Sequence, residues 1–288
     1  MTVTMQSPHP PGTELDDLGL PVPLARPVRR VVSLVPSLTE AVAAGAPGLI
    51  VGATAWCTHP AGLEAERIGG TKNPDTARIV AMRPDLVIAN EEENRVPDLD
   101  ALRAAGIPVW VTRVHTLNQA FASLDRLLTL ACGLDRPVWL DEAVAAWSPV
   151  TASPVAASSP VEGAAHPPRR TAIVPIWRRP WMVLGRDTFA GDLLARLGVD
   201  NLYAHHAERY PAVPLAALRA AGADLVVLPD EPYAFAAHDG PEAFPGLPAA
   251  LVSGRHLTWY GPSLVRARHV LAGQLGGAGW RGATRSAQ

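Results

Sequence analysis

Cysteine is scarce in this sequence, and neither sign of charge is in excess. Only Cys57 and Cys132 occur among 288 residues, each with apolar or small neighbours, which excludes a disulfide framework and a zinc ribbon. We expect two free, buried thiols. The 25 basic and 27 acidic residues form no block of one sign, which excludes a nucleic-acid footprint and a patch for anionic membranes. The expected partner is a small neutral or charge-balanced molecule.

Long apolar runs are absent as well. No stretch reaches the roughly 18 apolar residues of a transmembrane helix, so we expect no membrane span. The chain opens with Pro8, Pro10, Pro11, Asp16 and Asp17 where a signal peptide would have an uninterrupted apolar segment. We therefore expect a cytoplasmic protein, with an extracytoplasmic one as the alternative if a signal sequence is missing from this chain.

Two kinds of catalytic motif are also missing. There is no nucleophile elbow, and the Gly69-Gly70-Thr71-Lys72 run lacks the glycine that a phosphate-binding loop requires four residues earlier. The nine histidines are scattered, so a metal site would need ligands brought together by folding alone. We expect neither nucleotide chemistry nor an intrinsic metal or cofactor.

Extended apolar runs alternate with helical segments in both halves of the chain. The predicted strands are residues 31–35, 49–52, 84–89, 109–112, 172–176 and 224–228, and the predicted helices are 39–44, 77–82, 98–105, 137–147, 189–197 and 215–221. Ser37 and Glu40 have the spacing of a capping box for the first helix. Continuous apolar strands alternating with helices predict an α/β fold, with parallel sheets covered on both faces.

The sequence predicts two lobes separated by a linker. Prolines among Ala, Ser and Thr between residues 148 and 168 predict a linker, because such a stretch cannot sustain a helix. The predicted boundaries are a disordered lead at 1–16, an N-terminal lobe at 17–135, a connecting helix and linker at 136–168, a C-terminal lobe at 169–275 and a flexible tail at 276–288.

Tryptophan is unusually frequent, and much of it follows predicted strands. There are eight Trp against four Phe, and Trp56, Trp177, Trp181 and Trp259 fall in predicted loops. Ligands of open α/β sheets bind at the carboxyl ends of strands, and loop aromatics suit a flat ligand. The alternative is that each ring fills the interior of its own lobe.

A set of motifs carries a family resemblance: residues 30–40 (RVVSLVPSLTE), Val51-Gly52, Gly69-Gly70, residues 84–88 (PDLVI) and residues 259–262 (WYGP). In this order, across residues 17–275, the chain resembles the helical-backbone substrate-binding proteins of ABC importers for vitamin B12 and iron siderophores. The resemblance implies two Rossmann-like lobes with parallel sheets joined by a connecting helix, with a ligand cleft between the lobes.

The cobalamin-binding branch of this family implies particular contacts. Trp56, Trp181 and Tyr210 match its aromatic positions, whereas Lys72 and Asn90 stand where that branch carries aromatic residues. A different tetrapyrrole or a ferric chelate therefore stays open as the ligand.

Docking to a permease is where the chain departs from the family. The resemblance implies one glutamate on each lobe that pairs with permease arginines, and those positions are Ala77 and Ala216 here. We therefore expect no docking of this kind.

The resulting hypothesis is non-catalytic binding of cobalamin or a similar metal chelate. The predicted ligand-binding residues are Trp56, Lys72, Asn90, Glu91, Glu92, Trp177, Arg178, Trp181, Arg186, Tyr210, Tyr233, Trp259 and Tyr260. The first alternative is an importer component for cobalamin or a ferric siderophore. The second is an enzyme that uses Glu92, Asp230 or Glu231 as an acid or base.

Overall fold

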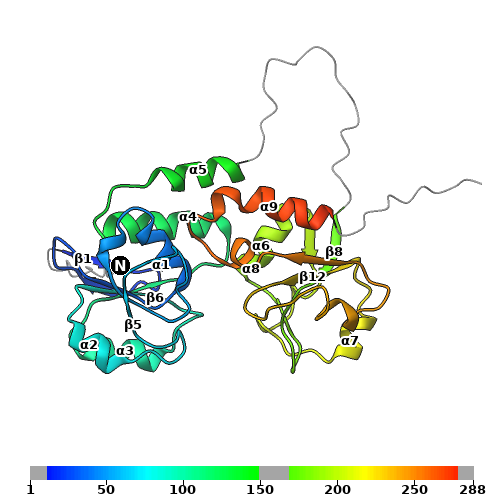
Figure 1. The fold of residues 1–288 in the computed structure, drawn as a ribbon, viewed down its shortest axis with the longest axis horizontal. Helices are drawn as coiled ribbons and strands as arrows, with labels where there is room; N and C mark the ends of the chain where they lie inside the picture. The colour runs from blue at the N-terminus through cyan, green and yellow to red at the C-terminus, as the bar shows by residue number, and fades with distance from the viewer. Residues whose placement is uncertain (1–11, 149–168, 278–288) are drawn as a thin grey trace, which may run out of the picture. The chain divides into compact units, whose positions relative to one another are not determined.

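The computed structural model describes residues 12–148 and 169–277 and divides into two compact units (Figure 1). Unit 1 comprises Met1–Val114, Asn118–Asp141 and Tyr260–Pro262, and unit 2 comprises His115–Leu117, Glu142–Trp259 and Ser263–Gln288. The prediction of two α/β lobes is confirmed. Residues 115–117 belong to unit 2 although the residues on both sides of them belong to unit 1, and residues 260–262 belong to unit 1 although their neighbours belong to unit 2. The sequence pattern did not indicate either exchange.

Unit 1 is built on a five-stranded parallel sheet with the order β5-β4-β3-β6-β7. Its strands are β3 (Val31–Ser33), β4 (Ile50–Ala53), β5 (Glu66–Arg67), β6 (Leu86–Asn90) and β7 (Val109–Thr112). The chain runs outward from β3 in one direction and then returns to add β6 on its other side. This reversal creates a topological switch point between β3 and β6, where open α/β sheets bind ligands.

The helices predicted at 39–44, 77–82, 98–105 and 137–147 are all present, whereas the helix at 117–126 and the turn that continues it to residue 131 were not predicted. The helices of unit 1 are α1 (Pro36–Ala43), the 3₁₀ turn η1 (Pro47–Leu49), α2 (Thr76–Met82), α3 (Val96–Ala104), α4 (Leu117–Arg126), the π-helical turn η2 (Leu127–Ala131) and α5 (Val138–Trp147), of which α4 and α5 each include residues of unit 2. Helices α2 and α3 pack against each other (Figure 1).

The capping box predicted for α1 is wrong. The helix begins at Pro36, its N-cap is Val35, and no side chain caps it. Proline is favoured at the first helical position because its fixed φ suits the helix and its missing N–H needs no partner there. Ser37 is consequently already inside the helix, where it cannot cap, and both it and Glu40 are buried.

The predicted disordered lead is wrong for residues 13–16. Strands β1 (Thr13–Leu15) and β2 (Pro21–Pro23) form an antiparallel hairpin. The hairpin is fastened to the edge strand β7: the Asp17 amide donates to the Val111 carbonyl at 3.1 Å, and the Val111 amide donates to the Asp16 carboxylate at 3.3 Å. The hairpin therefore covers backbone groups that an edge strand would otherwise leave unpaired.

Unit 2 is built on a four-stranded parallel sheet with the order β11-β8-β12-β13 and an antiparallel ribbon β9-β10. The strands are β8 (Arg170–Ile173), β9 (Pro175–Trp177), β10 (Met182–Val183), β11 (Val199–Asn201), β12 (Leu225–Pro229) and β13 (Ala249–Val252). The helices are α6 (Phe189–Arg196), α7 (Leu215–Ala220), the 3₁₀ turn η4 (Pro241–Ala243), α8 (Gly254–Thr258) and α9 (Leu264–Gly276). The predicted strand at 172–176 is thus divided into β8 and β9.

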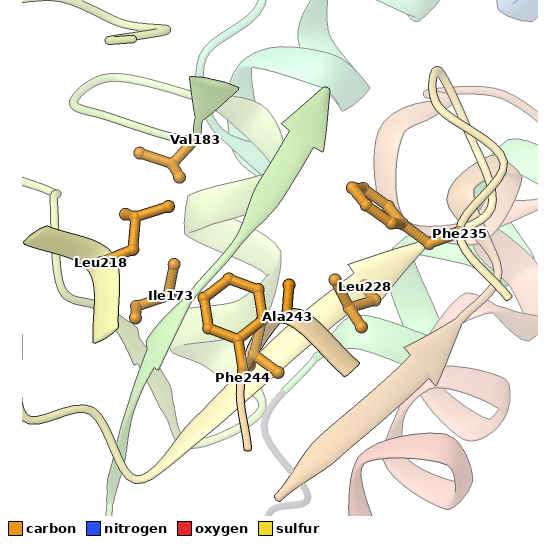
Figure 2. Close-up of a cluster of buried hydrophobic side chains, with 8 residues drawn as sticks. Ile173, Val183, Leu218, Leu228, Phe235, Ala243 and Phe244 are labelled. Carbon is orange, nitrogen blue, oxygen red and sulfur yellow. The ribbon is translucent and has the colours of Figure 1, made fainter. Parts of the chain in front are cut away.

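One buried apolar cluster underlies the loops of unit 2 (Figure 2). Its side chains come from β8, β10, α7, β12 and the segment after β12, and all but Val226 are labelled in Figure 2: Ile173, Val183, Leu218, Val226, Leu228, Phe235, Ala243 and Phe244. Burying a large apolar side chain contributes about 1.5–3 kcal/mol. Trp181 and Tyr233 pack against this cluster, which anchors two of the predicted ligand contacts.

Both cysteines are free and buried, which confirms the prediction for Cys57 and Cys132. Burial raises the pKa of the Cys132 thiol to about 12. Within residues 12–148 and 169–277, no helix is long and apolar enough to cross a membrane. The predicted linker at 148–168 and tail at 276–288 lie almost entirely outside the described residues.

Candidate functional site

The predicted aromatic contacts differ in how much of each ring is accessible. Trp56 follows β4 and is 66% exposed, and Trp177 ends β9 and is 43% exposed. Trp181 is partly buried, whereas Trp259 is only 8% exposed. Two of the four loop tryptophans therefore present large accessible faces, and two are mainly packed against their own unit.

In unit 1, Asn90 and Tyr260 form a buried polar network at the carboxyl edge of the sheet. Asn90 ends β6, and its Nδ2 donates to the Tyr260 hydroxyl at 2.7 Å and to the Thr112 carbonyl at 3.1 Å. The Thr112 hydroxyl lies 3.1 Å from that of Tyr260 and donates to the Ala89 carbonyl. Burial raises the pKa of Tyr260. The side chains of Asn90 and Tyr260 are thus hydrogen-bonded to each other. That they also contact a ligand stays a prediction.

The segment after β6 has its own internal bonds. The Asn90 Oδ1 accepts from the Glu92 amide at 2.8 Å, and Lys72 donates to the Glu92 carbonyl. The Glu91 carboxylate pairs with Arg113 at 2.7 Å. The structure thus brings Lys72, Asn90 and Glu92 together at the switch point of unit 1. It also pairs Glu91 with a cation that the sequence analysis did not identify.

In unit 2, the predicted contacts Trp177, Trp181 and Tyr233 lie in one aromatic array. The Trp177 ring meets Tyr233 edge to face with centroids 5.7 Å apart, and Tyr233 meets Phe235 at 4.6 Å. Trp181 stacks on Phe235 at 6.0 Å with an 11° interplanar angle. These distances fall in the range of favourable aromatic pairs. Each ring limits the motion of the next, so Trp177 stands on a packed support.

Arg178 is engaged within this array. Its guanidinium pairs with Asp239 and with Glu242, the latter at 2.7 Å, and lies 5.3 Å from the centre of the Trp181 ring. The Tyr233 hydroxyl donates to Asp239 at 2.6 Å, and this bond, with Arg178 nearby, lowers the pKa of Asp239. Sequence reasoning missed Asp239 and Glu242 because acidic residues in a loop carry no local signal of a distant partner.

Trp259 is bonded to a carboxylate that the enzyme alternative would use. Its indole Nε1 donates to Glu231 at 3.0 Å, and burial raises the pKa of Glu231. The Asp230 carboxylate accepts from the Gly254 amide at 2.6 Å. A Cβ at Gly254 would lie 2.6 Å from the Glu231 backbone, so only glycine allows this close approach. Both carboxylates therefore have structural partners.

The remaining predicted residues of unit 2 are Arg186 and Tyr210. Arg186 and Asp187 form an exposed pair at 3.6 Å, and Tyr210 is partly buried beside Pro211. A cavity of about 330 Å³ in unit 2 is lined by His115, Asp187, Thr188, Asp192, Asn201 and His205, among others, and by none of the predicted contacts. Among the described residues, no group of three or more His, Cys, Asp or Glu side chains is placed to hold a metal ion.

Sequence comparison identifies relatives of the chain. The profile of a family described as periplasmic binding protein matches residues 31–236. Vitamin B12-binding proteins of Yersinia pestis (strain Pestoides F) and Yersinia pseudotuberculosis serotype O:3 (strain YPIII) are 34% identical over 105 residues, which is 36% of this chain. The matched region spans only 38% of the length of these relatives.

Solved structures share the fold over most of the chain. The periplasmic vitamin B12-binding protein of Vibrio cholerae has a TM-score of 0.65 at 17% identity and covers 87% of this chain and 97% of its own. The periplasmic heme-binding protein BhuT, in complex with two hemes, has a TM-score of 0.65 at 25% identity, with 86% and 98% covered. The Helicobacter pylori protein CeuE with bound Ni(II) reaches 0.72 at 12% identity, with 91% and 88% covered.

Proposed function

This chain belongs to the periplasmic binding protein family, and we propose that it binds a bulky, flat metal chelate, cobalamin or a related tetrapyrrole such as haem, without transforming it. The match over residues 31–236 and the shared fold confirm the resemblance to the helical-backbone substrate-binding proteins. The choice of ligand rests on the rings that the chain presents and on what similar proteins bind.

The observation that carries the proposal is a pair of accessible indole rings on fixed supports. Trp56 follows β4 and Trp177 ends β9, and they remain 66% and 43% exposed although an indole favours burial. An aromatic ring of this size can bury about 150–250 Å² against a flat partner. Relatives with 34% identity over their matched region bind vitamin B12, and a structural relative at 25% identity binds two hemes. Both ligands have extended flat rings that suit such faces.

Charge around these rings favours a ligand with anionic or amide edges. Arg179 is exposed and lies midway between Trp177 and Trp181 in the loop that joins β9 and β10, and Arg186, elsewhere in unit 2, has about half of its side chain exposed. Guanidinium groups bind carboxylates through two parallel hydrogen bonds, as the propionates of a haem would require. Arg178 is not assigned this role, since two carboxylates already engage it.

Binding without turnover is favoured over an enzymatic role by the bonds of the candidate acids. Asp230 accepts from the Gly254 amide, and Glu231 accepts from the Trp259 indole. A general acid or base must reach the reacting group of a substrate, and these carboxylates are committed to structural donors. If the chain were an enzyme, Glu231→Gln would abolish turnover of the bound compound and leave its affinity intact.

We also propose that the protein acts in the cytoplasm and does not dock to a permease through paired glutamates. Ala77 and Ala216 occupy equivalent places, the second residue of α2 and of α7, and both are exposed without a carboxylate. Two free cysteines agree with a reducing compartment. Fractionation of the native host tests this, with recovery in the cytosolic fraction expected. Release of the protein by osmotic shock of intact cells would contradict it.

The binding proposal is tested by titrating the purified protein with cyanocobalamin, haemin and a ferric siderophore while recording tryptophan fluorescence. We expect quenching at micromolar concentrations by one of the two tetrapyrroles. Calorimetric titration of Trp56→Ala and Trp177→Ala should show about 10- to 100-fold weaker binding, since each lost ring removes roughly 1.5–3 kcal/mol of apolar burial.

A matched control is Trp139→Phe, which changes a tryptophan on α5 that does not follow a strand. Its affinity should equal that of the unaltered protein. Absence of quenching by all three compounds at micromolar concentration would contradict the proposal. Equal affinities in the two alanine variants and the control would show that neither Trp56 nor Trp177 contacts the ligand.

A further inference from the structure

The exposed Trp56 is carried by a four-residue turn, Thr54 to Cys57. The Cys57 amide donates to the Thr54 carbonyl at 3.1 Å, which closes the turn and places Trp56 at its third position. Thr54 and Cys57 are fully buried, while the ring between them is 66% exposed. The two ends of the turn are thus fixed in the unit and its tip projects outward.

Contacts on the inner side hold the turn against the sheet. The Cys57 sulfur lies 3.0 Å from the Thr39 hydroxyl and 3.2 Å from that of Thr54. The Ala55 amide donates to the Gly69 carbonyl at 2.8 Å. These bonds fix the backbone on the buried side, but none of them is donated to both the Thr54 and the Cys57 carbonyl at the two ends of the turn.

Arg67 makes that connection. Its Nη1 donates to the carbonyls of both Thr54 and Cys57, each at 3.0 Å. Arg67 ends the edge strand β5, where it pairs with Ala53 of β4 in the sheet register. One guanidinium nitrogen therefore joins the start and the end of the turn to the neighbouring strand.

The indole has a defined resting place beside this turn. A Cβ built at Gly70 would lie 3.6 Å from the Trp56 Nε1 and 2.5 Å from the Asn73 Oδ1. The bare Gly70 backbone therefore lies next to the nitrogen edge of the ring, with no room on that side for another side chain. Both the turn that carries the ring and the surface beside it are set before any ligand arrives.

We propose that Arg67 is a positioning residue that pre-organises Trp56 for ligand binding, an inference that rests on the proposed function of Trp56. Ordering one side chain on binding costs about 0.5–1.5 kcal/mol, which corresponds to a roughly 2- to 13-fold change in affinity. Arg67 removes part of that cost by fixing the turn in the free protein. It does so through two backbone carbonyls and without touching the ligand.

The test is a double-mutant cycle with haemin and cyanocobalamin as probes. Arg67→Met, which keeps the side-chain length and removes the donors, should weaken binding about 3- to 10-fold. The same change in a Trp56→Ala background should have no further effect, because the residue acts through the ring. Arg67→Lys, which can donate to one of the carbonyls, should have an affinity between those of the unaltered protein and Arg67→Met. An equal loss in both backgrounds, or no loss in either, overturns the proposal.

Arg78→Met is the matched control. Arg78 lies on α2, pairs with Glu66 of β5 and is about half exposed, and within the described part of the chain its side chain is hydrogen-bonded to Glu66 and not to the turn. It should leave affinity unchanged. Circular dichroism and the thermal midpoint should show that Arg67→Met folds as the unaltered protein does.

A second measurement is independent of any ligand. In protein labelled with 5-fluorotryptophan, the ¹⁹F resonance of Trp56 is assigned by its loss in Trp56→Phe. Arg67→Met should shift or narrow that resonance in the free protein and leave the others in place. If haemin and cyanocobalamin fail to bind the unaltered protein, the proposed function fails, and this spectrum still decides the role of Arg67. An unchanged Trp56 resonance counts against the positioning role.

Discussion

Replacing Tyr260 by phenylalanine should destabilise the protein although it removes a single oxygen atom. The Thr112 hydroxyl gives its proton to the Ala89 carbonyl, so it must accept the proton of the Tyr260 hydroxyl. The Tyr260 oxygen in turn accepts from Asn90 at 2.7 Å. The hydroxyl is therefore both a donor and an acceptor in one directed chain of hydrogen bonds.

The expected magnitude follows from the two bonds that are lost. Each buried neutral hydrogen bond contributes about 1 kcal/mol, and a buried donor left without an acceptor costs about 1–3 kcal/mol. Asn90 Nδ2 retains its bond to the Thr112 carbonyl and a longer one, of 3.3 Å, to the Thr112 hydroxyl, which limits the cost of the lost acceptor to the lower part of that range. We expect Tyr260→Phe to lower the free energy of unfolding by roughly 2–3 kcal/mol.

Urea unfolding followed by circular dichroism measures this change. The matched control is Tyr203→Phe, because the Tyr203 hydroxyl has no hydrogen-bond partner among the described residues, and its removal should change stability by less than about 0.5 kcal/mol. Combining Tyr260→Phe with Thr112→Val should give a coupling energy near 1 kcal/mol. Equal stability of the Tyr260 and Tyr203 variants would refute the directed network.

Two further predictions concern glycine packing and a shifted carboxyl group. Gly185→Ala should lower the stability measured by thermal unfolding by about 2 kcal/mol, because its Cβ would overlap the Glu208 carbonyl oxygen. Gly273→Ala, whose Cβ would enter open space on α9, should raise the stability by about 0.5–1 kcal/mol. Similar effects from both substitutions would contradict this account. Trp259→Phe should raise the pKa of Glu231 further above its ordinary value of 4.5, because it removes the hydrogen bond that favours the carboxylate. Because the folded state then binds this proton more tightly than the unfolded state, its stability falls as pH rises from about 4.5 through the raised pKa, and in the variant the fall should extend to higher pH. NMR titration of Glu231 and unfolding measurements at several pH values check this. An unchanged pKa of Glu231 would show that the indole bond has no influence on it.

Much of the fold could be predicted because its signals are local. The apolar runs at 84–89 and 224–228 became β6 and β12 within one or two residues, since few conformations bury such runs next to Pro and Gly. The helix predicted at 189–197 became α6, with Thr188 as its N-cap. In these places, propensity, pattern and turn chemistry favour the same structure.

The elements that were missed depend on distant partners. The β1-β2 hairpin contains Glu14 and two prolines, which disfavour a strand locally. It is fastened by Asp16 and Asp17 to Val111, about 95 residues later. Likewise, the role of Tyr260 depends on Asn90, 170 residues away. No window of neighbouring residues contains either relationship.

Arg67 and Arg178 show why the chemical type of a residue does not by itself settle its role. An arginine next to loop aromatics fits a ligand carboxylate and an internal brace equally well, since both use the same planar set of donors. What separates the two readings is whether acceptors already converge on the guanidinium. Arg178 follows Trp177 directly in the sequence, yet its acceptors come from Asp239 and Glu242. Arg67 lies eleven residues after Trp56 and bonds the carbonyls on either side of the turn that carries it. Backbone carbonyls have no residue-specific signature, so a brace of this kind is visible only once the chain is folded.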